Sequence, residues 1–539
     1  MPKIAPPRVE SREQSVASRG TGPLHSVKTS EGNTFRTLFG RLRGAREDEL
    51  FGPRGRLPRR GEPDTKRNTA LLILAGITLA GLALRLAIPR GIWLDEAISI
   101  HQAHLSLHDL FRNLYYGDRH PPLHHLTLWL TVRTFGDGEL AVRLPSLIAG
   151  TLVMPALYEL GRELYDRRTG LIAAAFGAAS PLLIWYAQEA RMYAFVTLFG
   201  LLALLTQLRV IRNPSMTNWA AYILATAALL WSHYFGLLLI GVQQLIFVAV
   251  LVNRRNTGEP VRPLALGFAY SAAVLVMQLV PLAVFAHSQF DSTGSALGSP
   301  SGTYDSLSFY AVVANMAWAL WGYHPDGITE LLAAMWPLFL LLSLLLLGRG
   351  GSRQTLILGA AALAPIVLLL GVAAFDRSLF EVRYFLIAVP LLLLLAARLV
   401  TGWIRKPSAR LLVAGGVIVT LLIGLADQQL NKDNPRLFDF RGATDEVKAD
   451  AGSRSLVLYD PPDMRYVLEY YAPDVRSRPL SRGRLPIRKR DGSPVFVLAS
   501  FQDNKLFFNR TNKAVGKLDF FRKRVKRAKK AQTTVWEFR

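Results

Sequence analysis

Apolar residues are concentrated in blocks of about 17 to 24 residues, and short basic or aromatic segments separate one block from the next. A helix needs about 20 apolar residues to cross the roughly 30 Å of hydrocarbon in a bilayer, so this pattern is typical of repeated membrane crossings. It predicts an all-α polytopic membrane protein. Eleven transmembrane helices are expected, at about 70–88, 141–160, 170–187, 193–211, 217–232, 236–252, 263–286, 328–348, 354–375, 383–400 and 409–426.

One further apolar block, 121–135, has only 15 residues and contains His124, His125 and Arg133. It is too short to cross the hydrocarbon as a helix, so we expect it to lie at the membrane surface together with an amphipathic stretch at about 98–116. Loop charge supports this, because the basic loops all become cytoplasmic if the N-terminus is cytoplasmic and 121–135 is not a span. Those loops hold 14 Lys/Arg against 3 acidic residues, at 161–169, 209–216, 253–262, 349–353 and 398–410.

Composition agrees with a membrane protein. Of the 539 residues, 51% are hydrophobic and 19% charged, with a mean hydropathy of +0.24, whereas a soluble protein normally carries about 25% charged residues. The chain has no cysteine, which excludes disulfides, thiolate metal sites and cysteine nucleophiles. The net charge of +24 does not indicate nucleic acid, because the basic residues lie beside the spans, where positive cytoplasmic loops and anionic lipids account for them.

The regions before and within the apolar blocks differ sharply. Residues 1–68 carry 15 Lys/Arg and 8 Asp/Glu with almost no apolar periodicity, which predicts a disordered cytoplasmic tail. Residues 69–426 are expected to form the membrane domain, in which 89–140 is the first outer loop.

Residues 427–539 would then lie on the extracytoplasmic side. Alternating segments at 455–459 and 494–499, with a helical pattern at 463–471, predict a small α/β domain. It has 25 Lys/Arg and 14 Asp/Glu. We expect this excess of 11 basic charges to engage an anionic acceptor or to rest on anionic lipid headgroups.

Two adjacent carboxylates, Asp95 and Glu96, follow the first span by a few residues, next to Trp93. A carboxylate that is partly desolvated near lipid can have a raised pKa, which suits a general base. The pair is therefore a candidate acid/base site. The alternative is an ordinary acidic first turn of a helix, which the helix dipole favours.

A second motif, Arg119-His120-Pro121-Pro122, stands where one element ends and the next helix begins, and it would direct Arg119 and His120 away from the bilayer. Six of the ten histidines lie between His101 and His125. A metal site is one interpretation of this density, and an interfacial loop of amphipathic side chains is the other.

A third motif, residues 185–193, contains Glu189, Arg191 and Tyr193 between two spans. An arginine so close to hydrocarbon is costly unless it is paired, and its planar fork of donors suits a phosphate. A contact with Glu189 or with a lipid headgroup is the alternative. Similar polar and aromatic clusters occur at two other outer span ends: His233 with Tyr234, and Arg383 with Tyr384. Arg85 and Arg143 lie inside spans, near the same face of the membrane.

With these motifs in this order, the chain resembles the GT-C glycosyltransferases, particularly the protein O-mannosyltransferase and lipid A aminoarabinose transferase group. That group has an Asp-Glu pair in the first outer loop, here Asp95-Glu96, and a His-Pro-Pro-Leu or Lys-Pro-Pro-Leu motif, here at 120–123. Arg143-Leu144-Pro145-Ser146 also resembles the group's arginine motif in the following span. The resemblance covers about 70–430 and is strongest at 82–195.

The resemblance implies a bacterial-type plasma membrane enzyme that uses a polyprenyl-phosphate sugar, with a mannose-type donor. It implies that Asp95 is the catalytic base or a carboxylate that orients the acceptor, and that Arg143 and Arg191 lie near the donor phosphate. The aminoarabinose enzyme has Glu-Lys where this chain has Arg119-His120, so its metal-binding glutamate is missing. No cofactor is therefore expected, although a divalent metal at the histidines stays open as an alternative.

We predict an inverting sugar transfer to an acceptor hydroxyl of a glycan, lipid or protein. Asp95 and Glu96 are the predicted catalytic carboxylates, and Arg143, Arg191 and Arg383 the phosphate ligands. The remaining substrate-binding candidates are Arg119, His120, Glu189, Tyr193, His233, Tyr234 and Tyr384. A transporter or lipid flippase is the main alternative, but its polar sites would cluster near the midplane, often within repeated halves. A scaffold built on the basic outer domain would leave these motifs unexplained.

Overall fold

The computed structural model describes most of the chain, and all described residues belong to one unit, 45–539. They are residues 65–88, 90–116, 120–293, 317–322, 335, 342, 345, 353–375, 382–432, 434, 437–451, 455–480, 494–500, 505–521, 523–530 and 532–539. The predicted tail, 1–68, falls almost wholly outside them.

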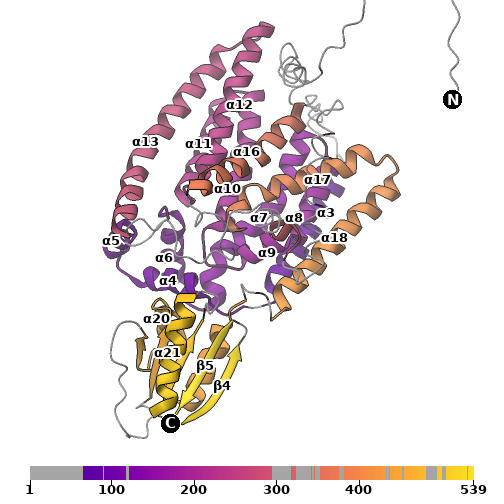
Figure 1. Ribbon diagram of the computed structural model, residues 1–539. Coiled ribbons are helices and arrows are strands. Elements are labelled where there is room, and N and C mark those ends of the chain that lie inside the picture. Colours follow the sequence, from indigo (N-terminus) through magenta and orange to yellow (C-terminus); the bar gives the residue numbers. More distant parts are fainter. Residues whose placement is uncertain are drawn as a thin grey trace, which may run out of the picture. The chain divides into compact units, whose positions relative to one another are not determined.

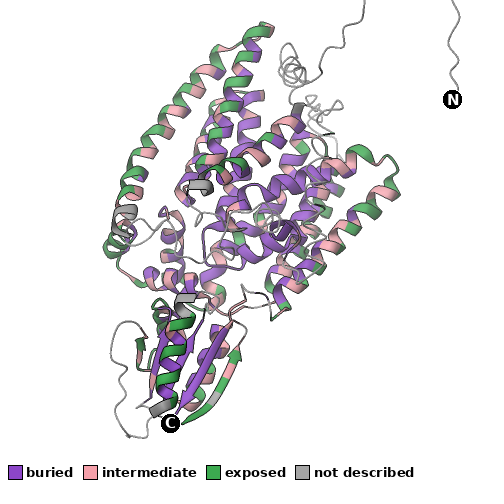
Figure 2. Cartoon of the chain, viewed as in Figure 1, coloured by how far each residue is buried: buried purple, intermediate pink, exposed green. Residues whose placement is uncertain are grey.

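A bundle of helices makes up the larger part of the structure (Figure 1). It consists of α3 (Thr65–Leu86), α7 (Glu139–Leu164), α8 (Arg167–Ala179), α9 (Pro181–Ala187), α10 (Tyr193–Arg212), α11 (Met216–Ser232), α12 (Gly236–Thr257), α13 (Arg262–Thr293), α16 (Arg353–Phe375), α17 (Val389–Trp403) and α18 (Pro407–Leu430). Burial is greatest along α10 and α9, whereas α13 and α18 expose apolar faces (Figure 2). Exposed apolar helix faces are expected where lipid covers them.

Seven of the described helices are long and apolar enough to cross a membrane, or eight if a bent pair counts as one span. The chain is thus a multi-pass membrane protein. The predicted span at 170–187 corresponds to α8 and α9, which are long and apolar enough together but meet at a bend of 61°. Pro181 begins α9 directly after Ser180, and a proline cannot donate the N–H that would continue the first helix.

The predicted span at 383–400 also differs from the structure. Its first part is a 3-10 helix, η3 (Val382–Ile387), and α17 follows with only 15 residues and a proline in its first turn. The predicted span at 328–348 falls almost entirely outside the described residues. The total of eleven spans therefore stays a prediction.

Three short helices connect α3 to α7: α4 (Leu94–His104), α5 (Leu107–Tyr116) and α6 (Leu123–Phe135). With 13 residues, α6 is about 20 Å long and, as predicted, is not a span. It packs against α4 and α7. The two prolines before it open the helix, since the N–H groups of a first turn have no partner inside the helix anyway.

Glycines let the central helices α7 and α8 approach closely. A Cβ on Gly170 would lie 2.4 Å from the carbonyl oxygen of Tyr158, and one on Gly161 would lie 2.7 Å from the Cα of Gly170. Small residues are common where membrane helices touch backbone to backbone. The close contact brings the backbones of α7 and α8 together in the centre of the bundle.

The C-terminal part is a five-stranded mixed sheet with helices on both faces (Figure 1). The strand order is β2-β1-β3-β5-β4, with β1 parallel to β2 and β3, and β5 antiparallel to β3 and β4. The two predicted strands and the predicted helix are confirmed as β1, β3 and α20. The bounds are α19 (Phe440–Asp450), β1 (Leu456–Asp460), α20 (Met464–Tyr471), β2 (Ser477–Pro479), β3 (Val495–Ala499), α21 (Lys505–Phe521), β4 (Arg524–Lys530) and β5 (Thr533–Phe538).

Alternate side chains of each strand enter different cores. On one face, Leu458 and Val497 pack with Leu518 of α21. On the other, Val457 and Leu498 join a cluster that includes residues of α19 and α20 and continues into α4 of the membrane domain. The period of two along a strand therefore directs one face of the sheet to the helices beside the candidate site.

Candidate active site

A buried ion pair anchors the start of α4. Arg143 of α7 donates from Nε to Oε1 of Glu96 and from Nη2 to Oε2, both at 2.7 Å. Glu96 also accepts the backbone N–H of Trp93 at 3.1 Å and that of Ala190 at 2.8 Å. Burial alone would raise the pKa of Glu96, but Arg143 and the Ala190 N–H more than offset burial and lower that pKa, so the carboxylate stays ionised.

The same arginine holds the segment before α4. Arg143 donates from Nη1 to the carbonyl of Arg90 at 2.6 Å and from Nη2 to that of Gly91 at 2.9 Å. Arg143 thus directs four hydrogen bonds at Glu96 and two carbonyls, and Glu96 accepts four. These bonds favour a structural role for the pair. The predicted roles, phosphate binding for Arg143 and catalysis for Glu96, stay predictions.

Asp95 contacts a different arginine. Its Oδ2 lies 3.4 Å from Nη1 of Arg383, which η3 brings from 288 positions further along the chain. Both side chains are partly exposed, at 27% for Asp95 and 19% for Arg383. A partly exposed carboxylate beside a cation is accessible to a hydroxyl that must lose its proton.

Arg191 lies between the start of α10 and α4. Its Nη1 donates to Oγ of Ser99 at 2.9 Å, and its Nη2 lies 3.4 Å from Nδ1 of His120. The backbone carbonyl of Arg191 accepts the hydroxyl of Ser146 at 2.9 Å, which ties the same residue to α7. Of the contact between Arg191 and Glu189 that we considered, the structure shows a backbone hydrogen bond, from the N–H of Arg191 to the carbonyl of Glu189 at 2.7 Å.

Aromatic rings surround His233 next to these two arginines. The ring centroid of His233 lies 5.5 Å from that of His120, 6.3 Å from Tyr193, 5.1 Å from Phe235 and 5.8 Å from Tyr384. The guanidinium of Arg383 lies 5.9 Å from the ring of Tyr193 and 5.6 Å from that of Tyr384. We call Asp95, His120, Arg191, Tyr193, His233, Arg383 and Tyr384 together the Asp95 site.

His233 is held neutral in one tautomer. Its burial, followed by the charges of His120, Arg383 and Arg191, puts its pKa well below the ordinary value. Its Nδ1 accepts the N–H of Phe235 at 3.1 Å, so the proton of the neutral ring is on Nε2. Nε2 is buried and has no hydrogen-bond partner within the described part of the chain. An unused buried donor is costly, and a ligand oxygen would satisfy it.

A second carboxyl group near the site, that of Glu189, is buried beside Arg90. Its Oε1 lies 4.0 Å from Nη2 of Arg90, whose guanidinium covers the ring of Trp185 at 3.7 Å. Burial raises the pKa of Glu189 to about 7, and Arg90 opposes this shift only in part. With its pKa raised this far, the carboxyl of Glu189 can carry a proton and then donate as well as accept a hydrogen bond.

The other predicted site residues are less closely tied to Asp95. Tyr234 occupies the turn between α11 and α12, directly after His233. Arg119 lies outside the described residues. His101 and His104, considered for a metal, instead contact Glu469 at 3.1 Å and Asp137 at 3.3 Å.

No metal-binding group is evident in the described ranges: they contain no cluster of three or more His, Cys, Asp or Glu side chains suited to an ion. His124 and His125 lie in α6 with ring centroids 5.9 Å apart, and His124 packs against Phe195 at 5.6 Å. Both rings are buried and pack against other rings, as histidines in a protein core do.

We predict that chelation leaves activity intact. We expect EDTA treatment followed by dialysis to change the transfer rate less than twofold, because the cations of the Asp95 site are arginines. The rate before and after treatment, with Mg²⁺, Mn²⁺ and Zn²⁺ added back singly, is the measurement. Loss of the rate with recovery in one of these ions would contradict the expectation and return the histidines to consideration.

Sequence reasoning missed two residues of this region. Arg90 pairs with Glu189, and Ser99 orients Arg191. A helical spacing could have indicated Ser99, which is four residues after Asp95 and donates to its carbonyl at 2.9 Å. No local pattern distinguishes Arg90, because its partner Glu189 lies almost a hundred positions further along the chain.

This chain has the fold of the GT-C membrane glycosyltransferases. Its features are a helical bundle, short connecting helices after the first span with a polar site at their start, and a mixed α/β C-terminal domain. Among solved structures it is similar to ArnT from Cupriavidus metallidurans in the apo state. The TM-score is 0.54 at 13% identity, over 88% of this chain and 98% of ArnT. The structure of that ArnT bound to undecaprenyl phosphate gives a TM-score of 0.52 at 12% identity, over 87% and 98%.

A third similar structure is the archaeal oligosaccharyltransferase AglB from Archaeoglobus fulgidus, in complex with an inhibitory peptide and a dolichol-phosphate. Its TM-score is 0.51 at 13% identity, over 83% of this chain and 71% of AglB. Within the sequence, residues 119–285 match the family model of dolichyl-phosphate-mannose-protein mannosyltransferases. No curated protein matches the sequence.

Proposed function

We propose that this protein transfers a sugar from a polyprenyl-phosphate carrier to an acceptor hydroxyl. The observation that carries the proposal is the Asp95 site itself: one accessible carboxylate, two arginines and a buried unused donor gathered at the ends of membrane helices. The bound lipids of the similar structures, undecaprenyl phosphate in ArnT and dolichol-phosphate in AglB, support a lipid-phosphate donor.

The proposed reaction is a single displacement. The carboxylate of Asp95 takes the proton of the acceptor hydroxyl while the hydroxyl oxygen forms a bond to C1 of the sugar. The bond between C1 and the phosphate oxygen breaks, and its electron pair leaves with the polyprenyl phosphate. One displacement inverts the configuration at C1. The arginines stabilise the charge that grows on the departing phosphate, and such preorganised charge is commonly the largest single contribution to catalysis.

The sugar would lie against the rings around His233. The Nε2–H of His233 can donate to a sugar hydroxyl or a phosphate oxygen, and Tyr193 and Tyr384 present aromatic faces beside it. The matched family model supports a mannose-type donor. We further propose a bacterial-type plasma membrane location with the N-terminus in the cytoplasm, and with the Asp95 site and the domain at 427–539 on the outer face. The basic loops at the opposite ends of the spans support this orientation.

The decisive test is reconstitution. Purified protein in liposomes is supplied with a panel of radiolabelled polyprenyl-phosphate sugars, with mannose first, and with membrane extract as the source of acceptor. Transfer of label to an acceptor with release of polyprenyl phosphate is the expected result. Movement of an intact donor between the leaflets without any bond cleavage would contradict the proposal and favour the flippase alternative.

Arg191→Ala should weaken donor binding by about 10- to 100-fold. The reason is the loss of charge-assisted hydrogen bonds to the phosphate, which contribute about 1.5–3 kcal/mol. Direct binding of a radiolabelled polyprenyl phosphate measures the effect, with the exposed Arg255→Ala as the matched control. An unchanged affinity in Arg191→Ala would limit Arg191 to its contacts with Ser99 and His120.

A further inference from the structure

The segment that leads to Asp95 is held by its backbone from several sides. Arg143 donates to the carbonyls of Arg90 and Gly91, and Glu96 accepts the N–H of Trp93. The remaining contact comes from the C-terminal domain, since the N–H of Ile92 donates to the hydroxyl oxygen of Tyr471 at 2.6 Å. These bonds satisfy the buried backbone groups just before the first turn of α4, which contains Asp95.

The hydroxyl of Tyr471 is itself oriented by a second bond. It donates its proton to Oε1 of Glu139 at 2.6 Å, and Glu139 forms a two-point ion pair with Arg441. Glu139 is in the first turn of α7, four residues before Arg143. The network therefore joins the segment before Asp95, the helix that carries Arg143, and α19 and α20 of the C-terminal domain.

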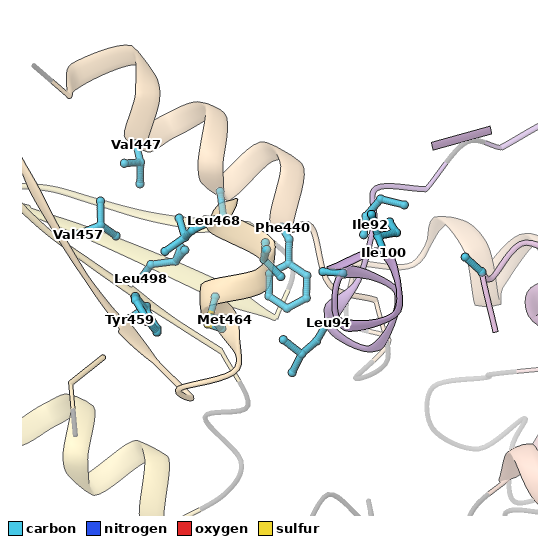
Figure 3. Packing of buried hydrophobic residues seen from close by; sticks show 14 of the residues in the cluster. Ile92, Leu94, Ile100, Phe440, Val447, Val457, Tyr459, Met464, Leu468 and Leu498 are labelled. Carbon is cyan, nitrogen blue, oxygen red and sulfur yellow. The ribbon is translucent and has the colours of Figure 1, made fainter. Parts of the chain in front are cut away.

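Apolar packing holds the two domains in contact around this network (Figure 3). Ile92, Leu94 and Ile100 share one buried cluster with Phe440 and Leu468 of the C-terminal domain, as the close-up shows. A Cβ on Gly91 would lie 3.2 Å from the Cβ of Arg441 and 3.3 Å from the hydroxyl oxygen of Tyr471. The backbone at Gly91 therefore leaves little room for a side chain between it and the domain.

The start of α20 also lies within the electrostatic reach of Asp95. Burial raises the pKa of Asp463, one residue before α20; Arg465 opposes this shift in part, and the negative charge of Asp95 adds to it. Further along the interface, His101 of α4 packs its ring 4.8 Å from that of Tyr466. The C-terminal domain thus borders the carboxylate that the proposed mechanism uses.

We propose that Tyr471 is a positioning residue for catalysis: through Ile92 and Glu139 it sets the orientation of the segment that carries Asp95, and the C-terminal domain is thereby part of the catalytic unit. This inference rests on the proposed function. It differs from a role of the domain in acceptor binding through its basic charges, because it places the effect on the rate of the chemical step.

Tyr471→Phe removes only the hydroxyl and keeps the ring in the apolar cluster. We expect kcat for transfer from radiolabelled polyprenyl-phosphate mannose, or from the sugar that the panel selects, to fall about tenfold, since small displacements of a catalytic group cost rate steeply. Donor affinity and the acceptor KM should change less than twofold. The matched control is Tyr470→Phe, which removes the neighbouring hydroxyl at the same interface, where it donates to the carbonyl of Asp137 at 2.9 Å. It should keep kcat within twofold.

A double-variant cycle tests whether Tyr471 acts through Asp95. In an Asp95→Asn background, Tyr471→Phe should lower the residual rate less than twofold, because the group that it positions is already inactive. If thermal unfolding shows that Tyr471→Phe is much less stable than Tyr470→Phe, Glu139→Met replaces it. That variant keeps the tyrosine but removes the acceptor that orients its hydroxyl, and it should lower kcat in the same direction.

Three results would overturn the inference: an unchanged kcat in Tyr471→Phe, a change confined to the acceptor KM, or the full tenfold loss repeated in the Asp95→Asn background. A wild-type protein that transfers no sugar in the same assay would contradict the proposed function instead. An active wild type with an unaffected Tyr471→Phe variant would contradict only the positioning role.

Discussion

Asp95→Asn should lower sugar transfer by about 10²- to 10⁴-fold, the range that a general base typically supplies. Asparagine has nearly the same shape as aspartate but cannot accept the proton of the acceptor hydroxyl. It also removes the negative charge that lies 3.4 Å from Arg383. The measurement is the initial rate of label transfer at saturating donor.

Two controls accompany this experiment. Binding of the lipid-phosphate donor should be retained, since only activation of the acceptor is lost. Asp109→Asn, an exposed aspartate on the neighbouring helix α5, should transfer at the wild-type rate. An Asp95→Asn rate above about a tenth of wild type would remove Asp95 from the role of base.

Arg143→Met should destabilise the protein by about 3–5 kcal/mol, the cost typical of leaving one charge of a buried pair unpaired. Glu96 is 1% exposed and would keep two backbone donors but lose its counter-charge. Unfolding of the purified protein in detergent, followed by heat or denaturant, measures the loss. We expect the double variant Arg143→Met/Glu96→Gln to recover a large part of it.

The matched control is an ion pair at the surface. Arg162 lies 2.6 Å from Glu159 on the same helix, but both side chains are about one-third exposed. Arg162→Met should therefore cost less than about 1 kcal/mol. If Arg143→Met and Arg162→Met lost the same free energy of unfolding, burial would not explain the stability that the Arg143–Glu96 pair contributes.

Local patterns in the sequence predicted the parts of the fold that local chemistry decides. Long apolar blocks predicted most of the membrane helices, because a helix crosses the hydrocarbon only if it is long and apolar enough. The block 121–135 has only 15 residues, which argued against a span there. Alternation likewise predicted β1 and β3. The bend between α8 and α9 was missed, although Pro181 is a visible signal, because a continuous apolar run masks a break in the backbone.

The class of protein, the short helices after the first span and the few polar motifs in which a site could lie all follow from the amino-acid sequence. Which polar residues contact each other depends on how the helices and the C-terminal domain pack. Asp95 and Glu96 are neighbours with the same chemistry, yet one faces Arg383 and the other is neutralised by Arg143. Arg191 is two residues from Glu189 but meets Ser99 and His120. Tyr471 reaches Ile92 across 379 positions. The physical reason is that burial and ion pairing determine the role of a charged side chain. The partners of these side chains lie far away in the sequence, so no short segment predicts which of them will come into contact.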